Sequence, residues 1–92
     1  MPVTSSVFTL SSATAIMIVQ PDNMPQHVHL HNMTKSSNEY VHVGPESVTI
    51  NNSIHIDPGE DLQVVLMQND TLWAVSDPDG LEVGVLAITK ED

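Results

Sequence analysis

The chain has 92 residues with 12 acidic side chains, two lysines and no arginine, so its formal net charge at pH 7 is -10. That length fits one small domain, and so negative a chain would repel the phosphates of nucleic acid and of anionic lipid surfaces, which excludes both as partners. The absence of cysteine excludes disulfides, thiolate catalysis and sulfur-ligated metals. The sequence shows no apolar run long enough for a membrane-spanning helix and no signal-peptide pattern, so we expect a protein that is neither membrane-bound nor exported.

Alternating apolar and polar residues, many of them β-branched, recur along the chain, whereas no window has the spacing of an amphipathic helix. The pattern predicts strands at residues 3–10, 13–20, 26–33, 39–44, 47–50, 53–56, 61–68, 71–76 and 81–89. Short turn-forming segments separate these strands. Many short strands without long crossovers predict an all-β domain, an antiparallel β-sandwich or jelly roll, with a small barrel as the other option.

Two of the predicted turns have the composition of tight hairpins. Asn51-Asn52 and Asn69-Asp70 are two-residue connectors whose side-chain types tolerate a positive φ. A type I′ turn needs a positive φ at both of its central residues. The sequence therefore predicts antiparallel hairpins at both places.

The most conspicuous polar feature is a row of histidines in the predicted strand 26–33. Burying Val28 and Leu30 in the core places His27, His29 and His31 together on the opposite face of the strand. The next strand has the same alternation, which places Tyr40 and His42 on its outer face. If these strands form a hairpin, His29 or His31 lies opposite His42, with Tyr40 adjacent.

These histidines are the candidate metal ligands of the chain. Alternate residues on a strand face lie about 6.5 to 7 Å apart, whereas an imidazole binds zinc at roughly 2.0 to 2.1 Å. A metal at His27, His29, His31 or His42 would therefore need a bent strand, a cross-strand ligand or a symmetry-related copy. A solvated or interface-lining row is the favoured interpretation, and we expect no cofactor and assign no catalytic residue.

A His-x-His on a strand is also typical of the cupins, whose metal motif adds a preceding glycine, a nearby glutamate and a histidine on a later strand. Glu39 lies farther from His31 than that pattern allows, and no glycine precedes the pair. A cupin-like metal-dependent enzyme therefore stays only as an alternative.

Two later strands are apolar on both faces. In strand 61–68 an inward stripe leaves Val65 and Met67 on the other face, and in strand 81–89 Leu86 and Ile88 lie opposite the inward valines. A surplus apolar face is covered by another layer of the same chain or by another chain, and we expect the second, a homo-oligomer. Trp73 is either a core or core-edge tryptophan or an interface anchor.

Four segments, at residues 28–34, 40–44, 53–62 and 70–76, resemble small β-rich bacteriophage virion proteins. The shared layout is a strand ending in Asn, a strand ending in Val-Gly, a Pro-Gly-Glu turn that opens a strand, and a Leu-aromatic-Ala-Val strand. It extends from Val28 to Leu86. Proteins of this kind decorate or cement the outside of a phage head, often as trimers.

The resemblance implies a structural virion protein, not an enzyme, that self-associates as a trimer and braces subunits of the major capsid protein. Its place is then the outer surface of the capsid, and the host cytoplasm during assembly. Residues 1–92 form a single domain, with 26–92 as the body and 1–25 as either an arm or a first strand pair. The alternative function is a virion adsorption or carbohydrate-binding module, in which Tyr40, Trp73 and the histidines form a sugar platform.

Overall fold

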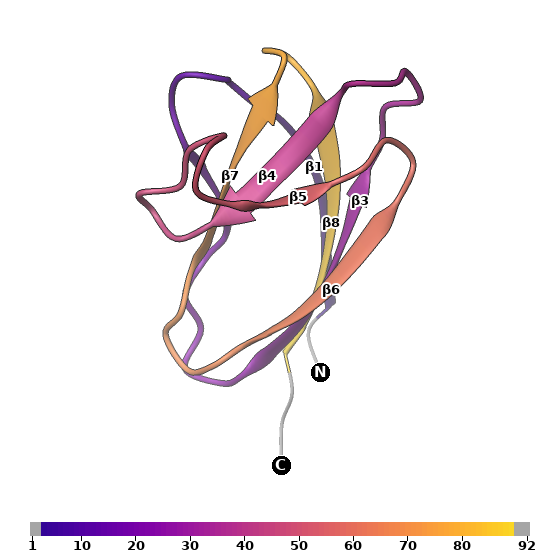
Figure 1. Cartoon of the computed structure of the whole chain (residues 1–92). Coiled ribbons are helices and arrows are strands. Elements are labelled where there is room, and N and C mark those ends of the chain that lie inside the picture. Colours follow the sequence, from indigo (N-terminus) through magenta and orange to yellow (C-terminus); the bar gives the residue numbers. More distant parts are fainter. Residues whose placement is uncertain (1–2, 90–92) are drawn as a thin grey trace.

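The structure, a computed structural model that describes residues 3–89, consists of eight strands in two sheets (Figure 1). Sheet A contains β1 (Val3–Thr9), β8 (Glu82–Thr89), β3 (Gln26–Asn32) and β6 (Asp61–Leu66), in that order. Sheet B contains β2 (Ile16–Val19), β7 (Leu72–Asp77), β4 (Tyr40–Gly44) and β5 (Ile54–Ile56). Every pairing is antiparallel, so the predicted all-β sandwich is confirmed.

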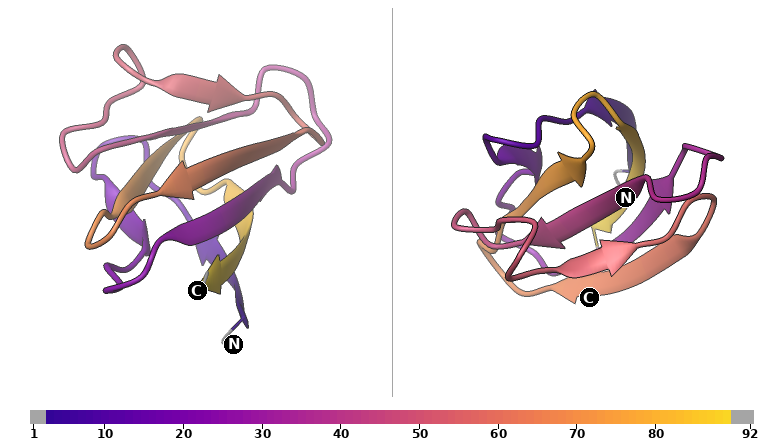
Figure 2. Two further views of the ribbon diagram at one scale, coloured as in Figure 1. Left: turned by 90° about the horizontal axis from the view of Figure 1, so that it is seen from below. Right: turned by 45° about the horizontal axis from the view of Figure 1, so that its top comes forward.

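The strand order is that of a jelly roll. The pairs β1–β8, β2–β7, β3–β6 and β4–β5 are the successive rungs of one long antiparallel hairpin whose closed end is the β4–β5 connection. This hairpin is wrapped so that its rungs alternate between the sheets, and the pairs β3–β8 and β4–β7 then complete them. In both views of Figure 2, β5 and β6 lie on one side of the sandwich and β1 lies on the opposite side.

The core lies between the sheets and is built from the alternate residues that the sequence pattern assigns to it. Val28 and Leu30 of β3 face Val41 and Val43 of β4, and all four are buried. Burying one such side chain stabilises the fold by about 1.5–3 kcal/mol. The other buried apolar members of the cluster are Leu10, Ile18, Val19, Ile56, Leu66, Leu72, Ala74, Val83, Val85 and Ala87.

One buried polar residue, Asn32, ties the two sheets together at the end of β3. Its Nδ2 donates to the carbonyl oxygens of Glu39 and Ile56, both at 2.9 Å. Its Oδ1 accepts from the backbone N–H of Thr34 at 3.1 Å and from the Thr34 hydroxyl at 2.8 Å. The side chain is fully buried and uses all of its hydrogen-bonding capacity. Asn32 therefore connects β3 of sheet A to β5 of sheet B.

Three local predictions are wrong. Residues 47–50 form a turn and irregular chain instead of a strand, so β4 and β5 are joined by a long loop and Asn51-Asn52 is not a tight hairpin. Asn69 has the expected positive φ of 65°, but β6 and β7 belong to different sheets. Asn69-Asp70 therefore turns the chain from one sheet to the other, because strands that pack face to face cannot pair through a hairpin.

Residues 3–19 belong to the sandwich: β1 pairs with β8 and β2 pairs with β7, so this segment is not an extended arm. Among residues 3–89, no helix is long and apolar enough to cross a membrane.

Candidate functional site

The outer face of sheet A, called the histidine face below, is the candidate site. Its residues form in-register rows across the four strands. The first row is Val3, Ile88, His27 and Val65; the second is Ser5, Leu86, His29 and Gln63; the third is Val7, Gly84, His31 and Asp61. The predicted outward row of histidines is thus present on β3. Ile88 and Leu86 of β8 lie beside it on one side, and Val65, Gln63 and Asp61 of β6 lie beside it on the other.

The apolar members of this face are not hidden within the protomer. Val3 and Val65, at the two ends of the first row, are both 57% exposed, Leu86 in the second row is 36% exposed, and Ile88 is half-buried. Met67, just beyond β6, is also exposed. Clustered exposed apolar side chains are typical of surfaces that contact another molecule.

The middle of the histidine face is hollowed where Gly84 lies between Val7 and His31. Because Gly84 has no side chain, an open depression of about 300 Å³ forms there, with Val7, Met33, Leu86, His29 and His31 among its walls. A Cβ added at Gly84 would meet only Met33 Sδ at 3.5 Å and more distant atoms, which is ordinary contact. The depression is therefore free to receive a side chain of another molecule.

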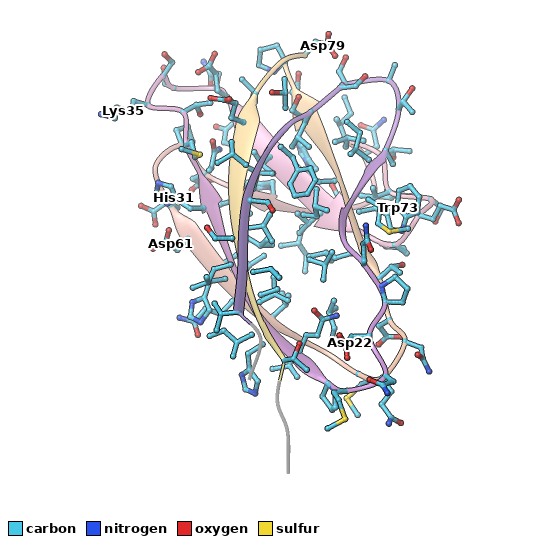
Figure 3. The ribbon with its side chains drawn as sticks, turned by 180° about the vertical axis from the view of Figure 1, so that it is seen from behind. Asp22, His31, Lys35, Asp61, Trp73 and Asp79 are labelled. Carbon is cyan, nitrogen blue, oxygen red and sulfur yellow. The ribbon has the colours of Figure 1, made fainter. Side chains whose placement is uncertain are left out.

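The third row ends in a hydrogen-bonded pair. His31 Nδ1 and a carboxylate oxygen of Asp61 are in direct contact, and Figure 3 shows both side chains on the same side of the molecule. Both are exposed, so this contact contributes at most a fraction of a kcal/mol to folding. It holds the His31 ring toward β6, beside the depression.

Sheet B differs because a loop of the same chain covers part of its outer face. Val48, from the loop between β4 and β5, is buried and lies so close to Gly44 that a Cβ there would be 3.0 Å from Val48 Cγ2. Val75, which also faces outward, is only 2% exposed. The chain therefore supplies its own cover for sheet B, whereas the histidine face has none within residues 3–89.

His42 lies under this cover, so the prediction that His29 or His31 lies opposite it is wrong. β3 and β4 belong to different sheets, and His42 is paired with His55 on β5 and with Val75 on β7. His42 Nδ1 is hydrogen-bonded to the Ser53 hydroxyl at 2.8 Å, and its buried Nε2 has no partner. Burial and the neighbouring His55 lower the pKa of His42 below its usual 6.5, although Asp77 acts in the opposite direction.

This lowered pKa gives the fold a pH dependence that His42→Gln tests. In the unfolded chain His42 binds a proton below pH 6.5, whereas in the folded state its lowered pKa opposes protonation. The free energy of unfolding is therefore unaffected by protonation of His42 above pH 6.5 and falls as the pH drops below that value. We expect the urea midpoint of wild type to fall between pH 8 and pH 5.5 by more than that of His42→Gln. Identical pH dependences in the two proteins would contradict this account.

The sugar platform predicted from Tyr40, Trp73 and the histidines is not assembled. Tyr40 packs edge-on against His55 with ring centroids 5.1 Å apart, and the half-buried Trp73 donates its Nε1–H to the Thr71 hydroxyl at 3.0 Å. Both residues belong to sheet B, Tyr40 on β4 and Trp73 on β7. Trp73 faces outward, because Leu72 and Ala74 take the core positions beside it. His27, His29 and His31 lie on the opposite face, and Trp73 is on the other side of the molecule from His31 in Figure 3.

The candidate metal ligands are divided in the same way, because His42 is in sheet B while His27, His29 and His31 are in sheet A. Across residues 3–89, no three His, Asp or Glu side chains lie close enough to hold one ion. The ligand set of the cupin-like alternative is therefore not brought together in that part of the chain.

Sequence reasoning missed five members of the histidine face: Val3, Ser5, Val7, Gly84 and Asp61. The alternation of residues 3–9 does not reveal which face of this strand is inward. The inward face carries the small polar residues Thr4 and Ser6 beside Phe8, whereas the valines are on the outward face. The parity of strand 61–68 could have found Asp61, since it shares a face with Gln63 and Val65.

Comparisons with known proteins give the fold and no family. No protein-family model matches the chain, and no curated protein matches it significantly. It is similar to a protein of Bacillus endospore appendages, which form a novel family of disulfide-linked pili, with a TM-score of 0.59, 12% identity, and coverage of 98% of this chain and 87% of that one. Another similar structure is Aeromonas hydrophila PliG, a periplasmic inhibitor of g-type lysozyme, with a TM-score of 0.45, 11% identity, and coverage of 97% and 85%. At such identities, the first likeness supports the β-sandwich fold alone.

Proposed function

We propose that this chain is a structural virion protein that decorates a bacteriophage head and binds the major capsid protein through the histidine face. One observation carries the proposal: the outer face of sheet A exposes Val3, Val65 and Leu86 and has an open depression beside Leu86, whereas the outer face of sheet B is partly covered by the chain's own loop. Exposed apolar side chains grouped on one face of a small domain favour contact with another protein.

The charge distribution favours the same face. The chain carries a formal charge of -10, yet the three rows of the histidine face contain one carboxylate, Asp61, and it is at the rim beside His31. Moving a carboxylate out of water without a partner is costly, so a surface with few acids is the easiest one to cover. Covering its apolar atoms contributes about 25 cal/mol for each Å² removed from water.

The test is co-sedimentation with capsid shells purified from a phage that lacks this gene. We expect wild-type protein to pellet with the shells, and Leu86→Glu to lose at least about tenfold in affinity, because the added carboxylate would be buried at the centre of the contact. Ile54→Glu is the matched control: it makes the same change at a 66% exposed position on β5, and we expect it to bind like wild type.

Two results would contradict the proposal. If wild-type protein stays in the supernatant, the chain does not decorate shells. If Leu86→Glu binds as tightly as Ile54→Glu, the histidine face is not the contact, even though the protein binds.

A further inference from the structure

The first strand is the most exposed element of the fold. β1 is at an edge of sheet A, and β8 is the one strand with which it pairs in the described part of the chain. Of its seven residues, Phe8 is half-buried against the core and the other six are exposed. An edge strand has a free row of backbone N–H and C=O groups that can pair with another strand.

This edge also lacks the features that usually prevent such pairing. Charged side chains, prolines and bulges protect natural edge strands. β1 contains no charged residue and no proline, and its register with β8 runs without interruption from Val3 to Thr9. The opposite edge of the same sheet is β6, which begins at Asp61 directly after Glu60. The two edges of sheet A are therefore chemically different.

The uncharged region extends beyond β1. Residues 1–21 contain no Asp, Glu, Lys, Arg or His, and the first ionisable side chain is Asp22. β1 and β2 are the edge strands of sheets A and B within this segment, and Figure 2 shows β1 on the side opposite β5 and β6. Two copies that each carry a charge of -10 repel each other, so they approach at least cost where neither has a charged side chain.

We propose that the free edge of β1 pairs antiparallel with β1 of a second copy, about a twofold axis at Ser6. This register pairs all seven residues: Ser6 with Ser6, Ser5 with Val7, and Val3 with Thr9 of the second copy. Each pair keeps outward residues beside outward residues, as antiparallel pairing requires. A twofold contact uses the same surface on both partners, so one edge is sufficient.

The pairing joins the two copies of sheet A into one continuous eight-stranded sheet, and it places their histidine faces side by side. It gives a dimer, in place of the trimer that the resemblance implies. The inference does not depend on capsid binding, since it concerns the protein alone in solution.

Single cysteines test the register, because the chain has none of its own. Directly paired residues have Cα atoms about 4.5–5.5 Å apart, within the range of a disulfide. We expect Ser6→Cys to form covalent dimers under mild oxidation much faster than Ser5→Cys, because residue 5 of the second copy lies two pairs away, at roughly 8 Å. Gln63→Cys, at an exposed position on β6, reports random collision. Equal crosslinking of Ser6→Cys and Gln63→Cys would overturn the proposal.

Sedimentation equilibrium tests the dimer without any crosslink. At about 0.5 mM we expect a species of twice the 10.0 kDa chain mass, and stronger association in 0.5 M than in 0.02 M NaCl because salt screens the repulsion between like-charged copies. Ser6→Lys would place two ammonium groups opposite each other, so we expect at least about tenfold weaker association with unchanged thermal unfolding. A monomer at this concentration, or association that weakens with salt, would overturn the proposal. Shell binding that fails while the dimer persists would count only against the capsid function.

Discussion

Asn32→Asp is expected to lower the free energy of unfolding by about 3–5 kcal/mol, because it turns a donor into an acceptor in front of two carbonyl oxygens, those of Glu39 and of the buried Ile56. Aspartate has nearly the same shape as asparagine, so the packing does not change. As a carboxylate it would also be buried without a counter-charge, since Asn32 is fully buried. A domain of this size has roughly 5–14 kcal/mol of stability in total, so the loss is a large part of it.

Urea and thermal unfolding measure this effect, with Asn51→Asp as the control. Asn51 is exposed, and the substitution there adds the same negative charge to the chain. We expect Asn51→Asp to unfold within about 0.5 kcal/mol of wild type. For a domain of this length, each kcal/mol corresponds to roughly 4–8 °C in Tm, so the two variants separate clearly. Similar stabilities for both would mean that the Asn32 hydrogen bonds do not hold the sheets together.

The sequence predicts most of the strands because residues such as Val28, Leu30, Val41 and Val43 alternate with polar residues. Alternation identifies which residues share a face, and it therefore places His27, His29 and His31 together correctly. It contains no information about which strands are neighbours. The error over His42 arises there, since β3 and β4 follow each other in sequence but lie in opposite sheets.

The role of Asn32 could not be predicted for a related reason. Its partners at Glu39 and Ile56 are backbone carbonyls, which leave no trace in side-chain types. The sequence around Val48 predicts a strand, because a buried valine among polar residues gives the same local pattern in a strand and in a covering loop. Which outer face is covered and which is exposed likewise depends on where that loop lies, and the pattern of residue types does not show this.

A pair of glycine variants tests the difference between the two outer faces directly. Gly44 and Gly84 both occupy outward-facing positions on inner strands, Gly44 on β4 of sheet B and Gly84 on β8 of sheet A. At Gly44 an added Cβ would lie 3.0 Å from Val48 Cγ2 and 3.3 Å from Val48 Cβ, whereas at Gly84 its nearest contact is Met33 Sδ at 3.5 Å. We expect Gly44→Val to destabilise the protein by about 1–3 kcal/mol through overpacking. We expect Gly84→Val to be neutral or stabilising, because valine favours a strand more than glycine does.

Val48→Ala tests whether the contact with Val48 is the reason that Gly44→Val destabilises the protein. This variant alone costs stability by removing buried methyl groups, but it also makes room at Gly44. The double variant with Gly44→Val is therefore expected to be more stable than the sum of the single effects. Urea unfolding of the four proteins in this cycle gives the coupling energy. Additive effects, or equal losses at Gly44 and Gly84, would mean that sheet B is no better covered than sheet A. The asymmetry on which the candidate site depends would then be absent in solution.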